Sequence, residues 1–288
     1  MKIKHRYLYL LAVGAVVLIT VRMVSAQNQN TLQNPELKEV SGVAASRINK
    51  NILYVHNDSG DTSRFFAINP NGQLKETFYF KGDAIDCEDI AVGPGSEKGK
   101  SYVYLGDIGD NHHERRTIEV YRFQEPKIKD QRTEHLNVNT NYFKYPDGPH
   151  DAETLMIDPV DRLFYIVTKR EDSVGVYTAP LNASFTDTIS LKLQCKLHFK
   201  GLPLFKWITA GDISAEGKQI LLKSYQKVYY WKRKPGEPVW KAMQAKPSEL
   251  PYTTEKQGEA IGFTVDGKGY YTTSEGKNAP IYFYQTPK

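Results

Sequence analysis

The sequence predicts an all-β protein, a β-propeller of four-stranded antiparallel blades, with five blades. Three observations support this prediction. A polar pair followed by alternating apolar residues recurs five times, a turn and a strand rich in Tyr, Val, Ile and Leu follow each copy, and no convincing long amphipathic helix is present. Repeats of this length, each holding four short strands, are typical of propeller blades.

The repeat begins with what we expect to be the innermost strand of each blade. The copies start 47, 65, 58 and 48 residues apart and occupy 41–45, 88–92, 153–157, 211–215 and 259–263. Each is followed by residues that accept turn geometry, such as Asn, Gly, Pro and Asp. Second strands, enriched in β-branched and aromatic residues, are then expected at 52–55, 102–105, 163–167, 219–222 and 269–272.

Third strands carry an aromatic residue near their centre and are expected at 65–68, 118–123, 174–177, 228–231 and 281–284. Fourth strands fit 77–80, 141–145 and 191–199. Because no fourth strand follows the last third strand, we expect one from the N-terminal segment, around 33–38. Such ring closure removes free strand edges. A diverged sixth blade would have to lie within 181–210 or 236–257.

The first 26 residues have the pattern of a signal peptide. Lys2, Lys4 and Arg6 precede an apolar stretch over 7–21, which is shorter than the roughly 20 residues that span a bilayer, and small residues precede Gln27. We therefore expect 1–26 to be removed and 27–288 to form a single propeller domain that is secreted or periplasmic, with no stable membrane insertion. The alternative is an uncleaved N-terminal membrane anchor.

Charge and cysteine content bear on partners. The chain carries a net charge of +5, and four cations but no acids lie in 1–26, so 27–288 carry +5 − 4 = +1. Lysine and glutamate are interspersed, whereas nucleic-acid binding needs a basic excess on one face; we expect no nucleic-acid partner. Cys87 and Cys195 fall in different repeats, which favours two free thiols over a disulfide.

The repeat also predicts where polar side chains meet. In a propeller the first strands line the central channel, and their starts open onto the same face as the ends of the second strands. Side chains at these positions would surround one mouth of the channel. The predicted ligand-binding residues are Asp58, Glu88, Asp107, Glu153, Lys169, Asp212, Glu259 and Glu275.

So many acids at one mouth need an explanation, because like charges raise one another's pKa. A hard cation such as Ca²⁺, held by Glu88, Glu153 and Glu259, would compensate them. Neighbouring lysine and arginine residues would do so as well, and a proton shared between two carboxyl groups would suit acid–base chemistry. A solvated polar channel whose acids cap strand ends is the remaining interpretation. The sequence leaves these four open.

Two histidines are the candidates for catalysis. His56 lies at the end of a second strand, and His150 precedes Glu153 by three residues, so each is a candidate general base. A hydrogen-bonded structural role is the alternative for both. The chain has neither a serine-hydrolase elbow nor a glycine-rich phosphate loop, and the loop at 107–111 lacks the register of an EF-hand.

Several strings together resemble those of a family of uncharacterised secreted bacterial β-propeller proteins. They lie at 40–42, 56–61, 88–95, 106–111, 145–148, 168–171, 258–260 and 273–276. The resemblance extends over nearly all of 27–288; where that family usually has tryptophan, this chain has Cys87. More distantly, the architecture is similar to phytase-like and gluconolactonase-like propellers, which implies central acids and amides that hold Ca²⁺ for hydrolysis. The residues do not map one by one onto those ligands.

Three functions fit the sequence. The first is a secreted propeller that binds a small molecule, glycan or peptide at its acidic mouth, with or without a divalent cation. The second is a metal-dependent hydrolase acting on a lactone, phosphoester or glycoside. The third is a scaffold for protein–protein contacts through its tyrosine-rich third strands. The sequence does not decide whether the protein is an enzyme.

Overall fold

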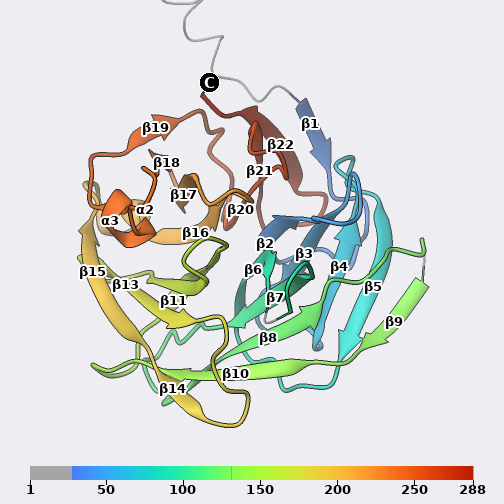
Figure 1. Cartoon of the computed structure of the whole chain (residues 1–288). Helices are drawn as coiled ribbons and strands as arrows, with labels where there is room; N and C mark the ends of the chain where they lie inside the picture. Colours follow the sequence, from blue (N-terminus) through green and yellow to red (C-terminus); the bar gives the residue numbers. More distant parts are fainter. Residues whose placement is uncertain (1–27, 96, 131, 288) are drawn as a thin grey trace, which may run out of the picture.

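The structure is a computed structural model, and it describes residues 28–95, 97–130 and 132–287. Its strands form five sheets around a central axis, which is the arrangement of a five-bladed β-propeller (Figure 1). The predicted all-β class and the five blades are confirmed. The described residues contain no sixth sheet.

The blades follow one another along the chain. Blade 1 contains β2 (Val40–Ala45), β3 (Leu53–Asn57), β4 (Arg64–Ile68) and β5 (Leu74–Phe80). Blade 2 contains β6 (Cys87–Pro94), β7 (Ser101–Asp107), β8 (Ile118–Gln124) and β10 (Asn139–Lys144). Blade 3 contains β11 (Ala152–Asp158), β12 (Leu163–Thr168), β13 (Ser173–Pro180) and β15 (Lys192–His198). Blade 4 contains β16 (Ile208–Ile213), β17 (Gln219–Ser224), β18 (Val228–Lys232) and β19 (Ser248–Leu250). Blade 5 contains β20 (Ala260–Phe263), β21 (Gly269–Thr273), β22 (Pro280–Gln285) and β1 (Asn28–Thr31).

The hydrophobic core lies between the blades and not within one of them. Alternation along each strand turns side chains to both faces of every sheet, and each face packs against the neighbouring blade. Tyr54 and Phe65 of blade 1, for example, share a cluster with Val103 and Phe123 of blade 2. The rings of Phe65 and Phe123 are 5.2 Å apart. Four further clusters join the other adjacent pairs, including blades 5 and 1.

The ring closes through the N-terminal segment, as predicted, but at a different place. The closing strand is β1, which pairs antiparallel with β22, and not 33–38. That stretch contains a turn in which the Leu37 N–H donates to the carbonyl of Asn34 at 3.0 Å. It leads from blade 5 into blade 1. The predicted signal peptide lies outside the described residues, and none of the helices within them is long and apolar enough to span a membrane.

Long connections reach back to the preceding blade. β9 (Arg132–Leu136) lies along the chain between β8 and β10 of blade 2 but pairs in parallel with β5 of blade 1. In the same way, β14 (Thr188–Ser190) lies along the chain between β13 and β15 of blade 3 but pairs in parallel with β10 of blade 2. In blade 4 the corresponding connection forms α3 (Val239–Met243), which contacts β15 of blade 3. The two stretches proposed for a sixth blade therefore extend existing blades.

Candidate functional site

Every innermost strand except β20 has a register shift at its start. The shifts skip Ser41, Glu88, Glu153 and Thr209. Glu259 takes the same place immediately before β20, because Ala260 pairs with β21 as Thr154 pairs with β12. A bulge turns one side chain out of the regular alternation. The five blades thus present equivalent side chains at one mouth of the channel, and three of them are glutamates.

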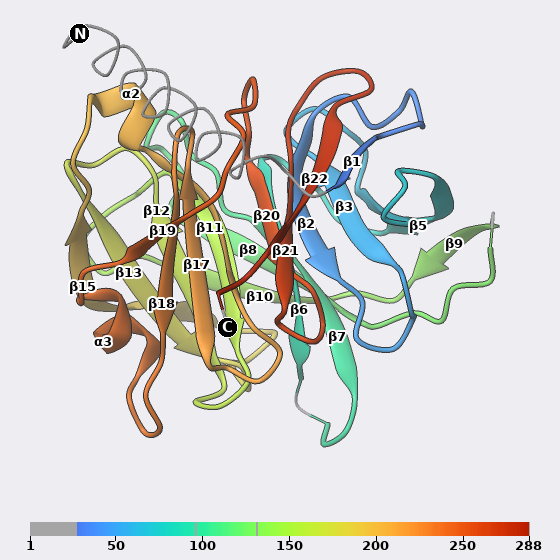
Figure 2. The same ribbon diagram turned by 90° about the horizontal axis from the view of Figure 1, so that it is seen from above.

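The second strands contribute an equivalent set just after they end. Each lies two residues after the second-strand residue that pairs with the first residue beyond the bulge (or, in blade 5, with Ala260). These residues are Asp58, Ile108, Lys169, Tyr225 and Glu275. Their backbones are fixed in a similar way: the N–H of Asp58 donates to Glu39 O at 2.7 Å, and that of Lys169 to Asp151 O at 2.9 Å. The mouth lies on the face that carries α2 (Pro203–Lys206), which directly precedes β16 (Figure 2).

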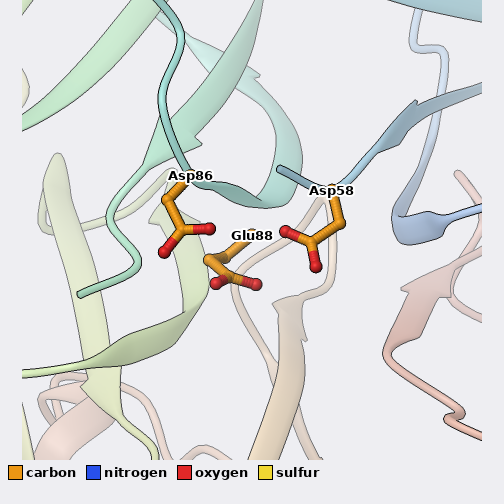
Figure 3. Close-up of side chains that lie close together, drawn as sticks. All are labelled: Asp58, Asp86 and Glu88. Carbon is orange, nitrogen blue, oxygen red and sulfur yellow. The ribbon is translucent and has the colours of Figure 1, made fainter. Parts of the chain in front are cut away.

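Three carboxylates from blades 1 and 2 lie close together at this mouth. One oxygen atom from each of Asp58, Asp86 and Glu88 lies within 4.8 Å of the others, and Figure 3 shows Glu88 between the two aspartates. Glu88 is buried and the aspartates are half-buried. Gly109 makes this approach possible, because a Cβ there would collide with the carboxylates of Asp86 and Glu88.

Two further groups extend the acidic belt around the mouth. Within the same distance limit, Glu88 also groups with Asp151 and Glu153, and Asp58 groups with Glu259 and Glu275. Lys169 lies between the ends of this belt. Its Nζ forms an ion pair with Glu153 and lies 3.7 Å from Glu259 Oε1. The structure therefore brings together six of the eight predicted ligand-binding residues.

The titration behaviour follows from burial and crowding. Burial raises the pKa of Asp58 to about 6, with further increases from Asp86 and Glu259. Burial and the carboxylates of Glu153, Asp58 and Asp86 hold the pKa of Glu88 well above its usual range. Burial alone would lower the pKa of Lys169, but the Glu153 and Glu259 carboxylates outweigh it and raise that pKa. The electrostatic potential at the mouth is thus negative and favours bound protons or cations.

Asp107, the seventh predicted residue, lies one position before the mouth-facing set. Side chains alternate along a strand, so its carboxylate points elsewhere. It accepts hydrogen bonds from the N–H groups of Ile85 at 2.9 Å and Asp86 at 3.1 Å, and pairs with Arg115 at 2.6 Å. Asp107 therefore holds the loop that carries Asp86, and it belongs to the support of the site.

Asp212, the eighth, does not lie at the mouth, which corrects the prediction. The structural equivalent of Glu88 in blade 4 is Thr209, so the repeat as aligned from the sequence is two residues out of register there. A slip of two preserves the apolar alternation but moves a residue about 6.6 Å along the strand. Asp212 lies near the far end of β16 beside a small cavity that Arg47 and Phe263 also line.

Sequence reasoning missed three residues of the site. Asp86 and Asp151 each precede a mouth glutamate by two residues, and this shared Asp-x-Glu spacing was visible in the sequence. Asp151 is fully buried and pairs with Arg170 at 2.6 Å. Tyr225 donates a hydrogen bond to Glu259. No spacing signal marks this contact, because it joins two different blades.

Neither candidate catalytic histidine is free at the mouth. His56 is fully buried, its Nδ1 lies 2.8 Å from the carbonyl of Asn57, and burial lowers its pKa to about 4. His150 is held between Glu171 at 2.7 Å and Asp147 at 3.1 Å. The hydrogen bond that the His150 ring donates to Glu171 is the main cause that raises the pKa of His150. Both environments suit structural histidines.

No family model matches the chain, and no curated protein matches it.

Proposed function

We propose that this propeller binds a divalent cation at Asp58, Asp86 and Glu88, and that the cation and the surrounding mouth bind a small polar ligand, a glycan or a peptide. The observation that carries the proposal is the approach of three carboxylates to within 4.8 Å of one another. Like charges at this separation destabilise a fold unless a cation or a bound proton compensates them. A bound cation would do so at this position.

The donor set favours Ca²⁺. All three groups are carboxylates, and Ca²⁺ takes six to eight oxygen ligands in flexible geometry, whereas zinc sites use mainly nitrogen and sulfur. Three carboxylates leave coordination positions for water and for oxygen atoms of a ligand. Hydroxyl-rich or carbonyl-containing molecules, such as glycans and peptides, provide oxygen atoms of this kind.

The two alternative functions have less support. Both histidines predicted as general bases of a hydrolase are engaged or enclosed. A scaffold that uses the tyrosines of the third strands needs those rings to be exposed. Tyr121, Tyr177 and Tyr284 are instead buried between blades.

Calorimetric titration of Ca²⁺ into the protein tests the proposal. We expect binding of one ion and a higher melting temperature in Ca²⁺ than in a chelator. The Asp86→Asn, Glu88→Gln double variant should bind at least about tenfold more weakly, a loss of about 1.4 kcal/mol. Glu216→Gln is the matched control, because Glu216 is exposed and pairs only with Lys218 among the described residues.

The outcome that contradicts the proposal is equally plain. If the unsubstituted protein shows no heat of binding and no thermal shift in Ca²⁺, the proposed cation site at the mouth is wrong. If Glu216→Gln and the double variant lose the same amount of Ca²⁺ affinity, the binding comes from general surface charge and not from the mouth.

A further inference from the structure

The acidic belt at the mouth has two regions that differ in how their charge is compensated. In the first, Asp58, Asp86 and Glu88 converge with no ammonium or guanidinium group within ion-pair distance among the described residues. In the second, Glu153 of blade 3 and Glu259 of blade 5 face the ammonium of Lys169. Of these two regions only the second contains a side-chain cation, while Asp151, elsewhere in the belt, pairs with Arg170.

Lys169 is held firmly in the second region. Its side chain is 6% exposed, and its Nζ lies 5.7 Å from the ring centroid of Tyr225, within the range of a cation–π contact. The Tyr225 hydroxyl donates to the same Glu259 oxygen that faces the ammonium. Two carboxylates and an aromatic face thus surround one positive charge.

One oxygen of this arrangement is left over. Glu153 is 2% exposed, and its Oε2 has no hydrogen-bond partner among the described residues. A buried carboxylate oxygen without a partner is costly. The ammonium contacts Oε1, so the position has more acceptor capacity than the lysine uses. A cation with more coordination positions would use that capacity.

We infer that the Lys169 ammonium occupies a second cation position, formed by Glu153, Glu259 and the Tyr225 hydroxyl, and thereby limits the mouth to one divalent ion. This inference rests on the proposed function for the number of ions bound. Lys169 is then a specificity-determining residue: a divalent ion can bind at the Asp58–Asp86–Glu88 position, whereas the ammonium excludes one from the Glu153–Glu259 position. Replacement by an uncharged side chain of similar length should open the second position to Ca²⁺.

The test is the Ca²⁺ stoichiometry of Lys169→Met, measured by calorimetry together with thermal unfolding in chelator and in Ca²⁺. We expect one ion for the unsubstituted protein and two for Lys169→Met. In chelator the variant should melt at a lower temperature, and Ca²⁺ should raise its melting temperature by more than it raises that of the unsubstituted protein. Lys227→Met is the control, because Lys227 pairs with Glu249 on the outer part of blade 4.

The outcomes separate the inference from the proposed function. One ion bound to both proteins would overturn the inference and leave the proposed function standing. If no ion binds to the unsubstituted protein and one binds to Lys169→Met, the proposed function is overturned and the inference stands. If Lys169→Met does not fold in chelator, Ca²⁺ should restore its folding when equal ionic strength in NaCl does not; a variant that stays unfolded in Ca²⁺ also overturns the inference.

Discussion

Two aspartates, the buried Asp89 and the half-buried Asp212, join neighbouring blades through backbone hydrogen bonds. Asp89 accepts from the N–H of Leu155 in the next blade at 2.9 Å, and Asp212 accepts from the N–H of Phe263 in the next blade at 2.8 Å. Each also accepts from the residue that follows it. A carboxylate has two oxygen atoms and can cross-link two strands in this way. Both side chains therefore stabilise the contact between blades.

The pKa of Asp212 makes this contact sensitive to pH. Burial raises it to about 7, against 3.8 for an exposed aspartate. Because the folded pKa is the higher one, this group's contribution to stability is largest below pH 3.8 and is lost as the pH rises towards 7. At about 1.4 kcal/mol per pH unit, the change is at most about 4 kcal/mol, because solvent screens part of the effect at a half-buried side chain.

We therefore expect Asp212→Asn to flatten the stability profile between pH 4 and pH 7. The measurement is urea unfolding at several pH values, and the result is the difference in slope between the two proteins. Asp83→Asn, at an exposed position, should leave the slope unchanged. Parallel profiles for Asp212→Asn and the unsubstituted protein would contradict the assignment.

At the residue scale, the sequence predicted the mouth where the repeat was strong. Glu88, Glu153 and Glu259 were placed correctly because each follows the same pattern of alternation. Asp212 was misplaced because a two-residue slip satisfies that pattern equally well. The pairing of Lys169 with Glu153 and Glu259 was out of reach, because it depends on how three blades converge and not on spacing along the chain.

Among the elements, the N-terminal segment joins the last blade to the first. β1 adds the outer strand of blade 5, and the next residue, Leu32, is fully buried in the cluster between blades 5 and 1. The Leu32 N–H donates to Ala279 O at 2.9 Å, and the Gln33 N–H donates to Gly72 O at 3.0 Å. A few consecutive residues therefore fasten the last blade to the first.

Leu32→Ala should accordingly lower the free energy of unfolding by about 3 kcal/mol, the usual cost of emptying a buried leucine site. Chemical denaturation gives this value directly. Thr31→Ala changes an exposed neighbour in the same segment and should stay within about 0.5 kcal/mol of the unsubstituted protein. Similar losses in the two variants would show that Leu32 contributes no more than its surface neighbours.

Strands with buried apolar faces were predicted well, whereas the short strands that pair with a different blade were not. β2, β6 and β11 are buried along almost their whole length, so their apolar alternation is clear in the sequence. β14 is short and polar, and it forms by pairing with another blade. Local sequence carries little signal for a strand of this kind. For the same reason the closing strand was predicted at 33–38, whereas it is β1 at Asn28–Thr31.

For the molecule as a whole, the interfaces between blades decide its stability. Each blade shares its apolar side chains with two neighbours, and the fifth interface closes the ring. Opening one blade would expose two clusters at once. We therefore expect the described domain to unfold as one cooperative unit.

The two thiols report on this cooperativity. Both cysteines are free, which confirms the prediction from the repeat; Cys87 is buried and Cys195 is half-buried. Burial also raises the pKa of both thiols, which slows alkylation. In alkylation followed by mass spectrometry, Cys195 should react first, and Cys87 only through unfolding.

Leu32→Ala should then accelerate alkylation of Cys87 by roughly 100-fold, the factor that corresponds to about 3 kcal/mol. The substitution lies between blades 5 and 1, whereas Cys87 lies between blades 1 and 2. An unchanged rate at Cys87 would show that the blades open independently of one another.

The bulge at the start of the inner strands has a consequence for how such a protein changes its ligand. Its side chain leaves the regular alternation, so a substitution there need not disturb the apolar packing between sheets. Two of the five positions already carry hydroxyls in place of acids: Ser41 donates to Glu88 O at 3.1 Å, and Thr209 to Gly258 O at 3.2 Å. Exchange among acid, hydroxyl and other polar side chains at five sites, one per blade, would alter binding preference while the scaffold stays constant. Evolution or design can thus vary recognition here with little penalty in foldability.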